Sequence, residues 1–278
     1  MKSQWECVLQ NLGEWQGSFT QLSPTGEILK QIPSLISLRG VNNNQSIHLR
    51  LQRYYPDESG AVPAQPHELV RDFSTTGAGA LFFESGAFSE GSSYFATGIQ
   101  FGAEFAFIYN DRRMRLVQMF DPAGQLSQLT LIREQRVGTD APERPLLQLK
   151  DLLGDWQGEA TTLYPNSLQV ETSSTTRRLV WQGEQVLQMA DSQSLLLQPA
   201  QTQLGVAHFS FEQDGLLFQS LLLPDGASAT FPTEIRLGRA FFLETGWLLQ
   251  PNLRQRLIRR YDANGKWLNV TFMIEQKR

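Results

Sequence analysis

Two arginines and two glutamates recur at matching places in the sequence and could bind a charged group. Arg115 precedes a short turn and Glu134 follows it, while Arg256 and Glu275 flank a similar turn 141 residues later. A buried guanidinium needs a counter-charge, either from a glutamate or from the carboxylate of a ligand. Arg115 and Arg256 are therefore candidate ligand-binding residues if they point inward, and solvated or structural residues otherwise.

The turns also suggest which residues face each other. A four-residue turn would set Arg115 opposite Thr130 and Arg256 opposite Thr271. Because side chains alternate along a strand, one face of each hairpin carries the arginine, the threonine and the glutamate. The other face carries leucine and phenylalanine, and the pattern leaves open which face lines the interior.

Further candidates lie around the second hairpin. Glu244, like Glu104, could anchor a ligand or donate a proton. Trp247 and Tyr261, together with neighbouring phenylalanines, either line a cavity or belong to an ordinary core. With the two arginines, the residues Glu244, Trp247 and Tyr261 make up the predicted ligand-binding set.

The sequence has no recognisable catalytic or cofactor pattern. It lacks a nucleophile elbow, a phosphate-cradling glycine loop and a dinucleotide fingerprint. Its three histidines are not spaced as metal ligands, and its one cysteine, Cys7, excludes a thiolate zinc site. We predict no catalytic residues, no metal and no cofactor, and leave an enzymatic activity open.

Composition narrows the class of protein. The chain has 278 residues, 41% of them hydrophobic, and a net charge of −4. No run approaches the roughly 18 apolar residues of a membrane helix, and residues 1–6 lack the apolar start of a secretion signal. We expect a cytoplasmic protein that binds no nucleic acid and does not span a membrane, and composition identifies no protein partner.

An internal repeat divides the chain. LGEWQG at residues 12–17 returns as LGDWQG at residues 153–158, and eight of thirteen positions from residue 12 onward are identical at an offset of 141. The two predicted domains are residues 1–138 and 139–278. Each starts with a short helical segment that ends at a glycine, and continues as short strands separated by turns.

The repeated motif carries a resemblance. Gly13 and Trp15, and likewise Gly154 and Trp156, form the Gly-x-Trp pattern that is similar to the lipocalin and wider calycin signature. The resemblance implies a plug in which the tryptophan closes each barrel and a basic residue of the last strand packs on it. Arg136 and Lys277 stand at that place, with lysine as a departure from the usual arginine.

The whole chain also resembles a cyanobacterial and plastid family of two-domain lipocalin-like proteins of unknown function. Residues 242–247, with Arg256, Tyr261, Asp262 and Gly265, carry this likeness. Phycobiliprotein lyases are similar single-barrel relatives. The resemblance implies an all-β fold of two tandem lipocalin-like antiparallel barrels, each preceded by a short helix, and an immunoglobulin-type sandwich is the alternative.

Three functions follow from that fold. The first is binding of a small hydrophobic or amphipathic ligand, such as a tetrapyrrole, a carotenoid derivative or a fatty acid, in one or both barrels. The second is a chromophore lyase or isomerase that acts by orienting its ligand. The third is a protein-interaction module, because the 17 phenylalanines could fill the barrels completely.

Overall fold

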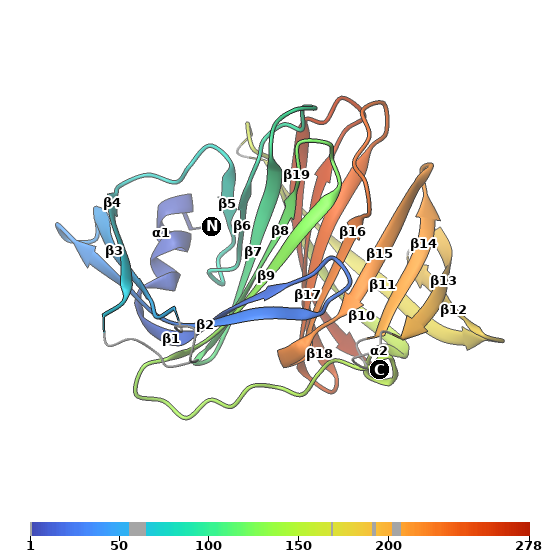
Figure 1. Ribbon diagram of the computed structural model, residues 1–278, viewed down its shortest axis with the longest axis horizontal. Helices are drawn as coiled ribbons and strands as arrows, with labels where there is room; N and C mark the ends of the chain where they lie inside the picture. Colours follow the sequence, from blue (N-terminus) through green and yellow to red (C-terminus); the bar gives the residue numbers. More distant parts are fainter. Residues whose placement is uncertain (1, 56–64, 168, 191–192, 202–206) are drawn as a thin grey trace.

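The computed structural model describes residues 2–55, 65–167, 169–190, 193–201 and 207–278. In these residues two β units follow one another along the chain, each opened by a short helix (Figure 1). The predicted all-β architecture of two tandem barrels is confirmed, with one difference: only the second sheet is closed by strand pairing.

The N-terminal unit is a curled sheet with two free edges. Within the described residues its strand order is β4-β3-β2-β1-β9-β8-β7-β6-β5, so β4 and β5 stand at opposite edges. Its elements are α1 (Gln4–Val8), a 3-10 turn (Leu9–Asn11), β1 (Gly13–Leu22), β2 (Ile28–Val41), β3 (Ser46–Arg53), β4 (His67–Phe73), β5 (Ala80–Phe82), β6 (Phe88–Gly91), β7 (Phe101–Tyr109), β8 (Arg112–Phe120) and β9 (Leu126–Arg136).

Helix α1 bridges the two free edges. The Gln4 amide donates to the carbonyl oxygen of Phe82 at 2.9 Å and accepts from the Phe82 backbone N–H at 2.8 Å, which satisfies edge groups of β5. On the other side, Trp5 packs edge-on against Phe73 at the end of β4. Figure 1 shows the helix between these strands. An unpaired edge exposes backbone groups, and α1 covers part of it.

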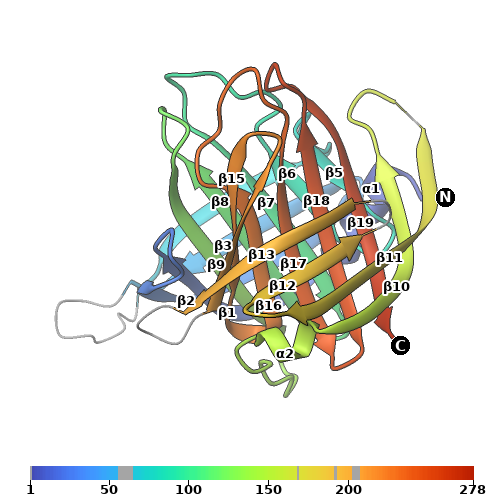
Figure 2. The same ribbon diagram turned by 90° about the vertical axis from the view of Figure 1, so that its right-hand side faces the viewer.

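The C-terminal unit is a closed antiparallel barrel that runs in sequence order from β10 to β19 in the described residues (Figure 2). Its elements are α2 (Leu149–Leu152), β10 (Gly154–Leu163), β11 (Val170–Gln182), β12 (Gln185–Ala190), β13 (Gln193–Gln201), β14 (Ala207–Gln213), β15 (Leu216–Leu222), a 3-10 turn (Pro224–Gly226), β16 (Ala227–Pro232), β17 (Phe241–Gln250), β18 (Leu253–Tyr261) and β19 (Trp267–Lys277).

The two last hairpins form as predicted but in a different register. Arg115 lies opposite Ile132 rather than Thr130, and Arg256 lies opposite Met273. Two features cause the shift in each hairpin. The loops at residues 121–125 and 262–266 have five residues rather than four, and a β-bulge follows at the end of β8 and of β18. A bulge adds a residue to one strand of a pair. The resulting shift is two residues, so each side chain keeps its face.

The apolar faces of these hairpins pack against each other across the two units. Strands β7, β8 and β9 lie beside β17, β18 and β19 (Figure 1), and one continuous core cluster includes residues of both units. Phe101 and Phe241 have ring centroids 5.8 Å apart, and Phe107 lies 6.3 Å from Trp247. The apolar face of these strands is therefore buried against the other unit, on the outside of its own sheet.

Loops add paired contacts between the units. Isolated bridges join Tyr94 to Lys266 and Gln125 to Glu234. The Phe95 backbone N–H donates to Gly265, and the Ile235 backbone N–H donates to Gly124, both at 2.8 Å.

A buried carboxylate fastens the linker between the units. Asp225, which is fully buried, accepts from the Arg112 guanidinium at 2.7 Å and from the Arg144 backbone N–H at 2.7 Å. Arg112 belongs to β8 and Arg144 to the connecting segment at residues 137–148, so three parts of the chain meet at one side chain. No helix in the described ranges is long and apolar enough to cross a membrane.

Candidate ligand-binding site in the N-terminal sheet

The mixed face of the first hairpin points into the curled sheet. Glu134, which is fully buried, accepts from Arg113 Nε at 2.7 Å and from Arg115 Nη2 at 2.9 Å. Arg115 also donates through Nη1 to Glu104 at 2.9 Å. Of the two orientations that the sequence allowed, the inward one is present, and glutamates supply the counter-charge.

The same network stands inside the barrel. Glu275 accepts from Arg254 at 2.7 Å and from Arg256 Nη1 at 3.0 Å. Arg256 also forms two hydrogen bonds of 2.7 Å with the carboxylate of Glu244. Each central arginine is therefore held by two glutamates, and neither needs a ligand carboxylate to balance its charge.

These ion pairs outweigh the cost of burial. Burial alone would raise the pKa of Glu134, but the guanidinium groups of Arg113 and Arg115 lower it to about 2. In the same way, Arg256 and its neighbours hold the pKa of Glu244 at about 2. Glu244 is thus a carboxylate at neutral pH and is poorly suited to the role of proton donor that the sequence suggested.

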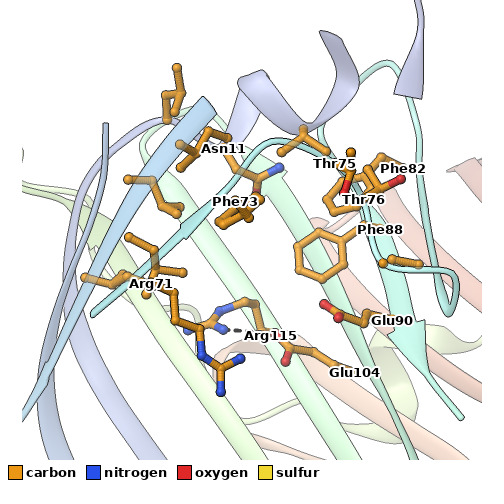
Figure 3. Close-up of a pocket in the computed structure, with 18 of the residues that line it drawn as sticks. Asn11, Arg71, Phe73, Thr75, Thr76, Phe82, Phe88, Glu90, Glu104 and Arg115 are labelled. Atoms are coloured by element: carbon orange, nitrogen blue, oxygen red, sulfur yellow. Dashed lines mark hydrogen bonds and ion pairs between the residues drawn. The ribbon is translucent and has the colours of Figure 1, made fainter. Parts of the chain in front are cut away.

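A pocket of about 570 Å³ opens inside the N-terminal sheet (Figure 3). One wall is apolar and comes from α1, β2, β3 and the ends of β4 to β6. Its side chains include Val8, Ile36, Leu38, Ile47, Phe73 and Phe82. The other wall carries the charged groups Arg71, Glu90, Glu104 and Arg115. This volume lies within the range of small-molecule sites, and the split between apolar and polar walls suits an amphipathic molecule.

In the described residues, the carboxyl group of Glu90 and the guanidinium of Arg71 line this pocket without an ion-pair partner, and Arg71 is the one such cation. It reaches from β4 toward the end of the pocket where Arg115 and Glu104 lie (Figure 3). Within the described residues it makes no hydrogen bond or ion pair. The sequence does not single out Arg71 as a site residue, although Arg71 alternates with Leu69 and Phe73 and so shares their inward face.

Glu90 faces Glu104 across neighbouring strands in the same pocket. Burial, reinforced by the nearby charge of Glu104, raises the pKa of Glu90. The polar wall therefore holds a carboxyl group that takes up a proton more readily than an isolated glutamate.

Two of the predicted ligand-binding residues lie elsewhere. Trp247 and Tyr261 are fully buried on the outer face of the barrel, in the contact between the units, and line neither the pocket of the N-terminal sheet nor the cavity inside the barrel. The Trp247 indole donates to the Asp225 carbonyl oxygen at 2.9 Å, and the Tyr261 ring stacks on Phe241. Their alternation with inward residues on β17 and β18 explains the outward position. Arg256 and Glu244 do line a cavity, inside the barrel.

The Gly-x-Trp motifs lie at the base of each unit. Trp15 is fully buried, its indole donates to the Asn11 carbonyl oxygen, and the Arg136 guanidinium lies 4.3 Å above its ring. A side chain at Gly13 would come within 2.4 Å of Arg136.

The second motif has the same arrangement. The Trp156 indole donates to the Leu152 carbonyl oxygen, and the Lys277 ammonium lies 5.3 Å from the centre of its ring. Gly154, like Gly13, has a positive φ. In the parts of the chain that are described, no cluster of side chains could hold a metal ion.

Comparison with known proteins places this chain in a family. Residues 1–139 match the N-terminal domain of unknown function described as DUF3598. A crystal structure of a protein of unknown function from the DUF3598 family of Nostoc punctiforme superposes with a TM-score of 0.89, at 43% identity over 100% of both chains. The chain belongs to the DUF3598 family.

A second match concerns the barrel. Residues 143–278 match the C-terminal domain described as "Biogenesis factor required for ATP synthase 1". No curated protein matches the chain significantly. The fold thus has a solved relative in the DUF3598 family, and the barrel is similar to the C-terminal domain of a biogenesis factor.

Proposed function

We propose that the N-terminal sheet binds a small amphipathic molecule with an anionic head. The observation that carries this proposal is the pocket of about 570 Å³, which combines an apolar wall with the cation of Arg71, for which the described residues supply no ion pair. The head group would meet Arg71, while the apolar part would contact Ile36, Leu38 and Phe73. Fatty acids, carotenoid-derived acids and linear tetrapyrroles share this chemistry, and the resemblance of the Gly-x-Trp motifs to lipocalins supports the proposal.

Arg71→Gln should weaken the binding of a fluorescent fatty-acid analogue about fivefold, the upper range for one exposed charge pair. Titration of the purified protein, followed by fluorescence, measures the dissociation constant. Leu49→Trp, which places a ring in the same pocket, should reduce binding further because the ring fills space that the apolar chain needs.

Arg50→Gln is the matched control. Arg50 lies on the neighbouring strand β3, but its exposed side chain points outward and pairs with Glu68. Equal affinities of the wild-type protein and both pocket variants would contradict the proposal, as would equal losses in Arg71→Gln and Arg50→Gln. Biliverdin titrated in parallel distinguishes a tetrapyrrole from a fatty acid.

We also propose a role in the biogenesis of an ATP synthase. The match of residues 143–278 to the C-terminal domain of such a biogenesis factor supports it. In this proposal the chain acts as a protein-interaction module whose partner is an ATP synthase or its subunits. The role does not require a ligand in the N-terminal pocket.

Deletion of the gene in its own source should lower the amount of assembled ATP synthase several-fold while subunit synthesis continues. Native gels with in-gel ATPase staining measure the complex, and pulse labelling measures synthesis. Complementation with Leu49→Trp separates the two proposals. A normal amount of complex in the deletion strain would reject the biogenesis role and leave the ligand proposal untouched.

A further inference from the structure

The cavity inside the C-terminal barrel has an excess of positive charge. It has a volume of about 280 Å³. Among the described residues that line it, Arg177, Arg256 and Arg260 are opposed by the single carboxylate of Glu244. The pair of Arg254 and Glu275 beside it contributes no net charge, so the described residues leave two positive charges uncompensated.

Arg177 carries most of this imbalance. Its Nη2 donates to Gln188, but Nη1 lies 3.6 Å from Glu244, beyond hydrogen-bond distance. Its Nε and Nη1 are buried and have no hydrogen-bond partner in the described part of the chain. The nearby Glu244 is already engaged twice by Arg256. A buried donor without an acceptor is costly, more so when it is charged.

Arg260 lies in the same cavity with spare donors. Its Nη1 donates to the Thr271 hydroxyl at 3.0 Å, and that is its one hydrogen bond among the described residues. Ser220 and Thr230 add hydroxyl groups to the lining, 2.7 Å from each other. Guanidinium and hydroxyl donors converging on a small cavity form the donor set that oxygen anions require.

The positive charge is specific to the second unit, although both units share the arginine–glutamate network. Arg177 lies opposite Trp156, and the equivalent position in the first unit, opposite Trp15, is Ile36. Two further positions differ. Arg260 stands where the first unit has Met119, at the offset of 141. Thr230, which lies opposite the inward Glu244, stands where the first unit has Glu90 opposite Glu104. All three differences make the barrel cavity more positive than the N-terminal pocket.

Burial, together with the charge of Arg256, lowers the pKa of Arg177 to about 9. Guanidinium groups nevertheless remain protonated in proteins at neutral pH. An uncompensated buried cation is therefore stabilised most directly by an anion taken from solution.

We propose that the C-terminal barrel binds an oxyanion, the carboxylate or phosphate group of a small molecule, between Arg177 and Arg260. This site lies in a different unit from the amphipathic pocket and does not depend on it.

Titration with inorganic phosphate, sulfate and citrate at constant ionic strength tests the proposal. Calorimetry of the full chain in a chloride-only buffer should detect binding of at least one of these anions. The anion that binds most tightly shows whether the site prefers a phosphate or a carboxylate group. Arg177→Gln should weaken that binding at least tenfold, because it removes the central charge.

Arg178→Gln is the matched control. Arg178 is the next residue on β11, but its side chain is 56% exposed and pairs with Asp155 on the outside. It should bind the anion as the wild-type protein does. Absence of binding by the wild-type protein, or equal affinity of Arg177→Gln, would overturn the proposal.

Thermal unfolding gives a second readout that a merely structural arginine would not show. In chloride buffer, Arg177→Gln should melt at the wild-type temperature or above, because the variant lacks the uncompensated cation. With the bound anion added, the wild-type protein should gain in melting temperature and the variant should not. A variant that melts well below the wild type in chloride would mean that Arg177 is a structural residue, against the proposal. Arg260→Gln provides the same comparison if Arg177→Gln fails to fold.

Discussion

Acidification from pH 5 to pH 2 should unfold both β units, because three buried glutamates would lose the charges that hold the arginine networks together. The pKa of Glu134, Glu244 and Glu275 is lowered from 4.5 to about 2 by the surrounding arginines. Their stabilisation is therefore complete above about pH 4.5 and is lost as the pH falls through 2. Each shift corresponds to ~3 kcal/mol, and the three sum to on the order of 10 kcal/mol. Domains have a total stability of about 5–15 kcal/mol, so the loss is decisive.

Circular dichroism and tryptophan fluorescence between pH 7 and pH 1.5 measure this transition. Glu134→Gln and Glu275→Gln should be less stable at pH 7 and should show a weaker dependence on pH. Glu68→Gln, which removes an exposed pair with Arg50, is the control and should behave as the wild-type protein does. A transition that is unchanged in Glu134→Gln and Glu275→Gln would show that these ion pairs do not set the acid stability.

Asp225→Asn should cost about 3–5 kcal/mol, the range for breaking a buried ion pair from one side. Asp225 is fully buried and has φ of 58°, a conformation that asparagine also tolerates, so the substitution removes the charge and keeps the turn. Arg112 would be left buried without its carboxylate. Since Asp225 joins β8, the linker and the barrel, we also expect the units to unfold less cooperatively.

Urea unfolding at pH 7, followed by tryptophan fluorescence, measures the loss and shows whether one transition becomes two. Asp155→Asn is the control, because Asp155 pairs with Arg178 at 3.4 Å with both side chains more than half exposed. Its loss should stay below about 1 kcal/mol. Equal stabilities of Asp225→Asn and Asp155→Asn would contradict the role of Asp225 as a structural anchor.

The repeat and its hairpins were accessible from the sequence because glycines, turns and alternation are local features. The orientation of the hairpins was not. Usually one face of an antiparallel hairpin is buried and the other is solvated. Here both are buried, the side of Leu116 against the other unit and the side of Arg115 around glutamates. Local pattern alone could not separate an interior face from an interface, and Trp247 and Tyr261 were therefore assigned to a ligand cavity.

The candidate sites were only partly predictable for a related reason. Arg115, Arg256 and Glu244 stand out because they recur or lie near a repeated hairpin. Arg71 and Arg177 lie in strands rich in polar residues, where the sequence does not indicate which arginine lacks a partner. That property depends on which side chains from distant strands reach them, and it becomes visible only in three dimensions.

The paired contacts between the units have the form of a twofold axis. Tyr94 with Lys266 and Gln125 with Glu234 are the same contact made twice with the two units exchanged, and Phe101 meets its own counterpart, Phe241. Such an isologous interface is what two identical subunits form around a symmetry axis. The chain therefore has the arrangement of a homodimer within one polypeptide, with two halves that share one interface and differ in the charge of their cavities.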